Sequence, residues 1–400
     1  MKKTSEVLVI GGGPVGMYAA LALVSRGLDV QIIDKDEQGV AHSYGLALHP
    51  ESLRLLDELG LTRFLLPHGQ RIERLAFYDA ADRAQTLDFS VVEGAFPYVL
   101  VVPQTLLEDV LERALAKRGV RVLRNHQALS INNGPDHVEV EVARMDKASV
   151  GYGIAHTERS LDRIYNVRAD YVVGADGYES FVRRSQRIQV EKPWPTQWFT
   201  IFEFPAEMVT TDEARVVLHG AASNVLWPIY PGRGRWSFQV GESKSGSNPA
   251  ELAELLASRA PWFGTPPEEL VWANTARFEQ YLVERYGEGR VWLAGDAAHG
   301  TSPVGVQSMN VGLREAHDLA ERLSATRAGS TDRDLLGGYD ARWRSEWQSM
   351  LAISARLTPQ NGSQDWAAEN ANRLLCCIPA SGPDLARLLE QMHLDLRPAA

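Results

Sequence analysis

A glycine-rich turn near the start of the chain constrains its fold more than any other feature. The turn, residues 11–16, follows an apolar run at residues 7–10 that is typical of a buried parallel strand. It opens an apolar helix expected from about residue 15 to 26, and a second apolar strand, residues 30–33, ends at Asp34. Strand, glycine-rich turn, helix, strand and acid, in this order, predict a dinucleotide-binding βαβ unit.

The glycines of this turn have separate steric roles. Gly11 permits the tight bend, Gly13 lets the backbone approach a pyrophosphate, and Gly16 lets the helix pack closely on the strand. The positive end of the helix dipole then faces the phosphates, and Asp34 can accept hydrogen bonds from the ribose hydroxyls. The predicted dinucleotide-binding residues of this unit are Gly11, Gly13, Pro14, Val15, Gly16, Asp34 and Lys35.

A second turn, almost three hundred residues later, indicates that the dinucleotide is FAD. It follows an expected strand at residues 290–294 and contains Gly295 and Asp296. FAD carries a linear ribityl chain whose hydroxyls need an acceptor, and a carboxylate at the end of a strand suits that role. The next helix, expected from residue 307 to about 323, can direct backbone N–H groups near Met309 and Asn310 at the pyrimidine edge of the flavin.

The composition favours a protein that acts on small molecules. The chain has 400 residues, 44% of them hydrophobic, and a net charge of −10, which gives no basic surface for nucleic acid. Its two cysteines, Cys376 and Cys377, are adjacent, so they do not form an ordinary disulfide, and the protein is expected in the reducing cytoplasm. No ligand spacing typical of a metal site and no apolar run long enough to span a membrane is present in the sequence. The oligomeric state stays open between a monomer and a homodimer.

The order of the patterns predicts an α/β fold in three parts. A Rossmann-like FAD-binding domain is expected from residues 1–70, 100–185 and 285–330. An interleaved mixed β-sheet domain that binds substrate is expected from residues 71–99 and 186–284, followed by a helical C-terminal segment, residues 331–400. The strands expected in the sheet domain are residues 198–204, 214–219, 225–229, 235–241 and 271–278.

Three local patterns carry more detailed expectations. Strict alternation of apolar and polar residues at 235–240 predicts a strand with one solvent-exposed face and one buried face. A polar stretch, residues 144–163, separates two expected strands and is interpreted as the exposed tip of a hairpin. Asn248, followed by Pro249 and Glu251, predicts the capped start of a helix.

The turns at Asp176-Gly177 and Gly295-Asp296 are typical of one family. The chain resembles the single-component FAD-dependent aromatic hydroxylases, the family of para-hydroxybenzoate hydroxylase, phenol hydroxylase and salicylate hydroxylase. The likeness covers roughly residues 5–345. Its landmarks occur in family order: the glycine-rich turn, Pro103-Gln104 at the start of a helix, the Asp-Gly turn with Ser180 and Arg183, and the Gly-Asp turn with Pro303, Gly305, Met309 and Asn310.

The resemblance implies an FAD- and NAD(P)H-dependent monooxygenase. In that family NAD(P)H reduces the flavin without a Rossmann domain of its own, and O₂ then gives a C4a-hydroperoxide that transfers one oxygen atom to an aromatic, phenolic or similarly electron-rich organic substrate. The resemblance also implies that Gln104 contacts the flavin half of the cofactor and that Asp176 lies near the pyrophosphate. The further FAD-binding residues that it implies are Gly177, Gly295, Asp296, Gly305, Ser308, Met309 and Asn310.

Two departures from the family pattern concern the surroundings of the flavin. The family usually has an arginine within the stretch that corresponds to residues 42–50, and this chain has none. Val306 and Ser308 stand where the family tends to have glycine, and their side chains limit how closely the backbone can lie against the flavin ring.

The residues that touch substrate are less well defined by the sequence. Pro303 and Gly305 are expected to shape the surroundings of the ring, and His299 is a candidate proton-transfer group, although its position mostly serves structure in the family. Six of the ten tryptophans fall between residues 194 and 272, where they can line a pocket or pack in a core. The candidate substrate-binding residues are Tyr44, His49, Trp227 and Tyr230.

Other functions on the same scaffold stay open. A flavin-dependent halogenase should carry a Trp-x-Trp-x-Ile-Pro motif, which residues 226–231 do not match. An epoxidase or reductase of isoprenoid-like substrates, and a protein that binds FAD and a ligand without turnover, are the remaining alternatives.

Overall fold

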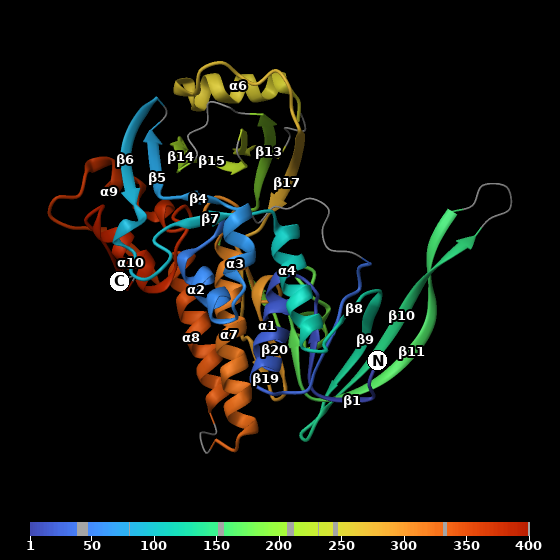
Figure 1. Cartoon of the computed structure of the whole chain (residues 1–400). Helices are drawn as coiled ribbons and strands as arrows, with labels where there is room; N and C mark the ends of the chain where they lie inside the picture. Colours follow the sequence, from blue (N-terminus) through green and yellow to red (C-terminus); the bar gives the residue numbers. More distant parts are fainter. Residues whose placement is uncertain are drawn as a thin grey trace.

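The structure, a computed structural model, divides into a first domain built on an eight-stranded sheet, a second sheet above it and a C-terminal segment beside both (Figure 1). It describes residues 1–37, 47–79, 81–150, 156–205, 212–230, 232–242, 247–330 and 334–398.

The sheet of the first domain has eight strands. Its central strand β1 (Thr4–Ile10) pairs in parallel with β2 (Val30–Ile33) on one side and with β11 (His156–Gly174) on the other. β8 (Val122–Leu123) continues the sheet beyond β2, and β20 (Val291–Leu293) continues it beyond β11, both in parallel. The carboxyl ends of these strands therefore lie at one edge, where open α/β sheets bind ligands.

Helix α1 (Pro14–Ser25) follows β1 and is almost completely buried. It packs against α4 (Gln104–Lys117) and α7 (Gln307–Arg327), which lie beside it in Figure 1. α1 is apolar on all sides because the sheet and these two helices surround it. The predicted helix starts at residues 307 and 103–104 are confirmed.

The hairpin of β10 (Val138–Val150) and β11 differs from the sequence expectation. The two strands pair from Val138–Ala169 to Val150–His156, so most of the polar stretch at 144–163 is strand and not a hairpin tip. β9 (His126–Asn133) pairs only with the inner part of β10, and the outer part projects from the body as a two-stranded ribbon (Figure 1). Polar residues suit such a ribbon because both of its faces meet water while its backbone groups pair with each other.

The second domain is a seven-stranded mixed sheet in the order β17-β13-β16-β15-β14-β5-β6. β14 and β5 pair in parallel. This pairing joins the two segments of the second sheet that precede and follow residues 100–185 in the chain. The strands are β5 (Arg74–Asp79), β6 (Asp82–Asp88), β13 (Gln197–Pro205), β14 (Glu213–His219), β15 (Ala222–Tyr230), β16 (Arg233–Val240) and β17 (Trp272–Phe278). The predicted α/β fold with an interleaved mixed sheet is confirmed.

Strand β16 is buried on both faces, which corrects the expectation of one exposed face. Trp236 and Phe238 pack under helix α6 (Pro249–Arg259), as the alternation predicts. On the opposite face Arg235 and Ser237 are only 5% and 4% exposed, respectively. Arg235 is buried because it forms an ion pair with Glu203 of the neighbouring strand β13, which compensates its charge. Alternation thus identified the two faces but not their burial.

The C-terminal segment contains α8 (Leu335–Met350), α9 (Asp365–Leu374) and α10 (Gly382–Glu390). It also contains a two-stranded antiparallel sheet of β22 (Ala355–Pro359) and β23 (Leu394–Pro398), which the expectation of a helical segment missed. α8 packs against α7, whereas side chains of α9 and α10 share a buried cluster with the second sheet. The segment is therefore integrated with both domains.

Short elements complete the fold. They are α2 (Pro50–Glu58), α3 (Thr62–Leu65), α5 (Phe181–Ser185), β3 (Ala47–Leu48), β4 (Gln70–Ile72), β7 (Val99–Val101), β12 (Val190–Glu191), β18 (Tyr281–Val283), β19 (Gly287–Glu288) and β21 (His299–Gly300).

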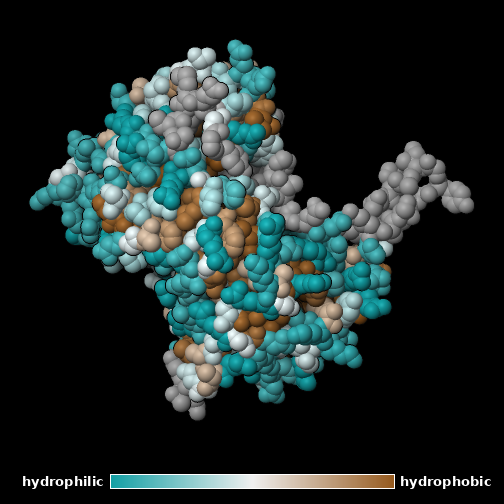
Figure 2. Space-filling model, viewed as in Figure 1, coloured by the Kyte–Doolittle hydropathy of each residue, from teal (hydrophilic) through white to brown (hydrophobic). Residues whose placement is uncertain are grey.

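The face of the molecule in Figure 2 is mostly hydrophilic, with hydrophobic residues gathered in the region of α2, α3 and α4. Among the described residues, no helix combines the length and apolar character that crossing a bilayer requires.

The capped start of α6 gives a test of the local folding argument. The side chain of Asn248 accepts a hydrogen bond from the backbone N–H of Glu251, at 3.0 Å. Asn248→Ala should lower the free energy of unfolding by about 1 kcal/mol, measured by urea denaturation. Glu254→Ala, an exposed change on the same helix, should alter it by less than about 0.5 kcal/mol. Equal effects of the two changes would contradict the capping role.

Candidate cofactor-binding site

The glycine-rich turn packs against the end of β11. Gly11 has a φ of +118°, and a Cβ atom there would lie 2.1 Å from the carbonyl oxygen of Ala175. A Cβ on Gly16 would lie 2.0 Å from the carbonyl oxygen of Gly11. Only glycine fits at both positions, so the turn is fixed by close backbone contact.

Gly13 differs from these two glycines. Its φ of −79° suits any residue, and a Cβ there would meet no protein atom within 4 Å. The turn therefore leaves an open space beside Gly13 at the N-terminus of α1, where backbone N–H groups and the helix dipole favour an anion. Pro14 and Val15, the first residues of α1, border the same end of the helix.

The Gly-Asp turn lies directly against the start of α1. A Cβ on Gly295, whose φ is +66°, would lie 3.1 Å from the methyl carbons of Val15. A Cβ on Gly312 of α7 would lie 2.8 Å from a methyl carbon of Val15 and 2.9 Å from the Cα of Gly295. The two turns, almost three hundred residues apart, thus touch through Val15.

Asp296 is exposed, whereas its neighbours Gly295 and Ala297 are buried. Desolvation by the surrounding protein nevertheless raises the pKa of the Asp296 carboxyl above its usual range, and the negative charge of Glu315 adds to the increase. In the part of the chain that the structure describes, no donor contacts this carboxylate. It is therefore available to accept hydrogen bonds from a bound polyol chain.

Asp34 lies at the end of β2 and faces the glycine-rich turn. Its carboxylate accepts hydrogen bonds from the backbone N–H groups of Gly12 and Asp36, the latter at 2.7 Å. Arg124 follows the end of β8. Its Nη1 lies 3.8 Å from the Oδ2 of Asp34 and donates to the carbonyl oxygen of Gly12 at 3.3 Å. Sequence reasoning missed Arg124, although its place after a strand of the same sheet edge was a usable signal. Lys35 is exposed beside Asp34.

The Asp-Gly turn caps helix α5. Asp176 accepts hydrogen bonds from the Ser180 hydroxyl at 2.5 Å and from the backbone N–H groups of Phe181 and Val182 at 2.7 and 3.1 Å. Desolvation raises the pKa of Asp176, against the effect of these bonds. The contacts are those of a structural cap, so a direct contact of Asp176 or Gly177 with the cofactor stays a prediction.

Arg183 connects the Asp-Gly turn to the Gly-Asp turn. Its guanidinium group donates to the carbonyl oxygens of Tyr178 and Ala297, at 2.7 and 2.8 Å. The three turns that sequence analysis singled out therefore form one continuous assembly at the carboxyl edge of the sheet.

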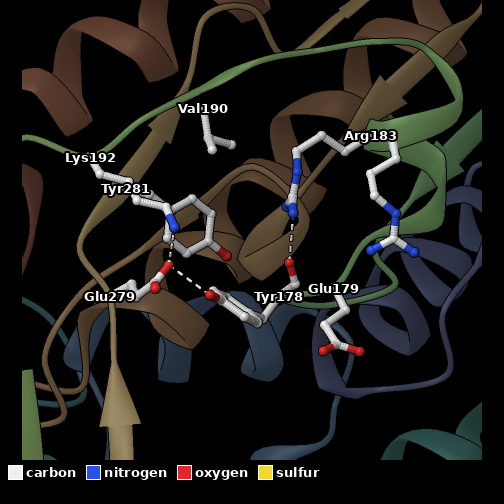
Figure 3. Close-up of a pocket in the computed structure, with 8 residues that line it drawn as sticks. Tyr178, Glu179, Arg183, Val190, Lys192, Glu279 and Tyr281 are labelled. Carbon is white, nitrogen blue, oxygen red and sulfur yellow. Dashed lines mark hydrogen bonds and ion pairs between the residues drawn. The ribbon is translucent and has the colours of Figure 1, made fainter. Parts of the chain in front are cut away.

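A pocket of about 210 Å³ borders this assembly (Figure 3). In it the carboxylate of Glu279 lies between the ammonium group of Lys192, at 2.5 Å, and the hydroxyl of Tyr178, at 2.6 Å. Desolvation opposes ionisation of Glu279, but the bonds from Lys192 and Tyr178 hold its pKa below the usual range. Tyr281 lines the same pocket and donates from its hydroxyl to the carbonyl oxygen of Asp296.

The loop before α7 is packed against the C-terminal segment. A Cβ on Gly305 would lie 2.5 Å from the carbonyl oxygen of Cys376, so this glycine is required by packing. Val306 has a φ of +52°, a left-handed conformation that is costly for a β-branched residue. Pro303, Ser308 and Met309 are half-buried beside it.

Asn310 ties this loop to the segment before α2. Its side chain donates to the carbonyl oxygens of Ala47 and Val306 at 2.8 and 2.7 Å. It accepts from the backbone N–H of His49 at 2.8 Å and from the Ser52 hydroxyl at 2.7 Å. All hydrogen-bonding positions of the Asn310 side chain are engaged within the protein, so this side chain has none left for a ligand.

His49 is buried and lies against the loop before α7. Its Nε2 donates to the carbonyl oxygen of Gly305 at 2.9 Å, which leaves Nδ1 as an acceptor without a partner. Desolvation lowers the pKa of His49 to about 3, so the ring is neutral at neutral pH.

The remaining predicted residues lie in three different settings. Trp227 is 2% exposed and shares a buried cluster with Val304 of the loop before α7. Gln104, the first residue of α4, donates from its amide to Glu108 at 2.8 Å. Tyr44 and the side chain of Tyr230 lie outside the described part of the chain.

His299 lies behind the Gly-Asp turn. The imidazole ring is 0% exposed, with Nε2 3.0 Å from Glu315, and it stacks on Trp347 with ring centroids 3.9 Å apart. This position favours the structural role over proton transfer. Groups of three or more potential metal ligands do not occur among the described residues.

Fold and site together define an FAD-binding α/β protein. A profile of the FAD binding domain family matches residues 4–353, so the chain belongs to that family. Relatives named as aromatic monooxygenases confirm its resemblance to the FAD-dependent aromatic hydroxylases.

Relatives of known description agree with the family. The chain is 28% identical to 6-methylpretetramide 4-monooxygenase of Streptomyces rimosus over 84% of its own length and 58% of that protein. It is 30% identical to the aromatic compound monooxygenase YhjG of Bacillus subtilis, described as uncharacterized, over 84% of this chain and 64% of that one. The chain thus spans less than two thirds of the length of these two relatives.

A solved structure supports the fold over nearly the whole chain. The crystal structure of p-nitrophenol 4-monooxygenase PnpA from Pseudomonas putida superimposes with a TM-score of 0.74 at 22% identity, covering 98% of this chain and 94% of that one. OxyS anhydrotetracycline hydroxylase from Streptomyces rimosus superimposes with a TM-score of 0.68 at 25% identity, covering 88% and 68%.

The two kinds of glycine in the first turn predict different variants. Gly13→Ala should leave the stability of the apoprotein within about 1 kcal/mol of wild type, because the methyl group enters open space. It should weaken FAD binding about tenfold or more, because the methyl group occupies the space beside the helix N-terminus. Gly11→Ala should instead lower the free energy of unfolding by about 3 kcal/mol or more. Thermal unfolding and flavin titration of the apoprotein measure both effects, and unchanged FAD affinity in Gly13→Ala would contradict the assignment.

The buried neutral His49 predicts a pH dependence of stability. The unfolded chain protonates this residue below its ordinary pKa of 6.5, whereas the folded protein does so only near pH 3. Its contribution to stability is therefore complete above pH 6.5 and falls as the pH falls toward 3. Between pH 7 and 5 the free energy of unfolding should decrease by about 2 kcal/mol more in wild type than in His49→Asn. Urea denaturation at both pH values measures this difference, and equal decreases would contradict the burial argument.

Proposed function

We propose that the chain is an FAD- and NAD(P)H-dependent monooxygenase that inserts one oxygen atom from O₂ into an aromatic, phenolic or similarly electron-rich substrate. The observation that carries the proposal is the assembly of three turns at one sheet edge, with an open space at Gly13 and an unpartnered carboxylate at Asp296. Membership of the FAD binding domain family supports the choice of cofactor.

The residues of the assembly fit successive parts of FAD. The N-terminus of α1 and the space beside Gly13 suit the pyrophosphate, and Asp34 suits the adenosine ribose. Asp296 suits the ribityl hydroxyls, and the backbone N–H groups at the start of α7 suit the pyrimidine edge of the flavin. Bound FAD supplies the transfer of electrons from NAD(P)H to O₂ and the delivery of one oxygen atom.

The protein's own part is to hold the substrate and exclude water. The second sheet, the loop before α7 and the C-terminal segment share one buried cluster that includes Trp227, Val304 and Cys377. Buried polar atoms without partners, the Nε1 of Trp227 and the Nδ1 of His49, occur among the residues of this region. An aromatic substrate with a polar substituent would satisfy such atoms while its ring meets apolar surface.

The names of similar proteins support an aromatic substrate class. They include enzymes named for 6-methylpretetramide, pentachlorophenol and p-nitrophenol. We therefore propose a phenolic or polycyclic aromatic substrate for this chain. The second sheet, with the segments 71–99 and 186–284, is proposed to bind it.

The decisive experiment combines cofactor and turnover. Purified protein should bind FAD, and NADPH or NADH should reduce it faster when a phenolic ligand is present. In a phenolic library at least one compound should stimulate NAD(P)H consumption and gain the mass of one oxygen atom.

The control is a set of polyene substrates, which should not be oxidised. Epoxidation of a polyene would favour the epoxidase alternative. A flavin that binds tightly but is not reduced by either nucleotide would contradict the proposal and indicate a ligand-binding flavoprotein.

A further inference from the structure

The carboxylate of Glu315, on α7, is completely buried and accepts four hydrogen bonds. Its Oε2 accepts from the backbone N–H of Gly295 at 2.8 Å and lies 3.0 Å from the Nε2 of His299. Its Oε1 accepts from the Tyr286 hydroxyl at 2.7 Å and from the Trp347 indole at 2.9 Å. Oε2 thus binds the Gly-Asp turn, whereas Oε1 binds side chains of the surrounding protein.

We propose that Glu315 is a positioning residue for FAD, because it fixes the backbone from which Asp296 projects. The inference rests on the FAD binding proposed above. Glu315 is buried and hydrogen-bonds to Gly295 and His299, so it acts through these two residues. A hydrogen bond from a backbone N–H to a buried carboxylate is charge-assisted and stronger than a neutral one.

The geometry of the turn explains why such support is needed. Gly295 adopts a left-handed φ of +66°, and Asp296 follows it with an exposed side chain. A rotation of the peptide at Gly295 would move both the Asp296 carboxylate and the contact with Val15. The bond to Glu315 opposes that rotation from the buried side.

Helix α8 of the C-terminal segment completes the support. Trp347 both donates to Glu315 and stacks on His299. Tyr339 donates from its hydroxyl to the carbonyl oxygen of Leu293 at 2.8 Å, and Asp340 accepts from the backbone N–H of Tyr286 at 2.6 Å. The C-terminal segment thereby supports the Gly-Asp turn from its buried side.

Glu315→Gln tests the proposal without changing the size of the side chain. Gly295 N–H and the Trp347 indole can only donate, and a glutamine oxygen can serve one of them while its NH₂ group faces the other. FAD affinity of the apoprotein, measured by flavin fluorescence titration, should fall about fivefold or more. Amide hydrogen exchange of a peptide that covers residues 293–298 should become faster.

Asp318→Asn is the matched control. Asp318 is buried on the same helix and accepts from the Trp343 indole at 2.8 Å, but it has no bond to the Gly-Asp turn. This change should lower the melting temperature and leave FAD affinity within about twofold of wild type. Removal of the competing indole in the double variant Glu315→Gln, Trp347→Phe should restore part of the lost FAD affinity, an effect that general destabilisation would not produce.

Three outcomes would overturn the inference. They are FAD affinity within about twofold of wild type in Glu315→Gln, an equal loss in Asp318→Asn, and an unchanged exchange rate at residues 293–298. If Glu315→Gln does not fold, Glu315→Asp is measured instead. It keeps the charge but shortens the reach to Gly295, so wild-type affinity in Glu315→Asp would also overturn the inference. Failure of the wild-type protein to bind FAD would instead contradict the proposed function, on which this inference rests.

Discussion

The contact of Val15 with Gly295 and Gly312 is the constraint on which the site depends. These three residues bring the start of α1, the Gly-Asp turn and helix α7 so close together that a single added methyl group on either glycine would collide with a neighbour. The open space at Gly13 and the carboxylate of Asp296 consequently lie at one edge of one sheet. A cofactor with a phosphate part and a polyol part can then be held along its length by residues that are distant in sequence.

On the buried side of this sheet edge, hydrogen-bond networks hold the backbone in place. A carboxylate in a protein core is stable only when donors surround it, and Glu315 receives them from the turn, from Tyr286 and from helix α8. The loop before α7 is held in a similar manner by Asn310 and His49, whose polar atoms are mostly engaged within the protein. Both networks fix backbone segments that are proposed to bind the cofactor.

Much of this arrangement could be predicted from local sequence, because the strands and helices of the first domain carry clear apolar periods and glycine or proline at their ends. The starts of α1, α6 and α7 follow from Pro14, Asn248 and the residues after Gly305. Local patterns failed where tertiary contacts decide the outcome. The alternating pattern predicts that Arg235 is solvent-exposed, but its ion pair with Glu203 allows it to be buried. Most of the polar stretch at 144–163 forms strands because the two strands satisfy each other's backbone hydrogen bonds. The role of Glu315 depends on neighbours in other elements, among them Tyr286 and Trp347, which no local spacing reveals.

The central claim is that two distant turns hold one FAD molecule, the first at its phosphates and the second at its ribityl chain. Calorimetric titration of the apoprotein with FAD and with ADP, in wild type and in Asp296→Ala, tests it most directly. ADP can occupy only the half of the site formed by the glycine-rich turn. The account predicts that Asp296→Ala weakens FAD binding about tenfold or more and leaves ADP binding unchanged. Equal weakening of both ligands, or unchanged FAD affinity, would contradict it.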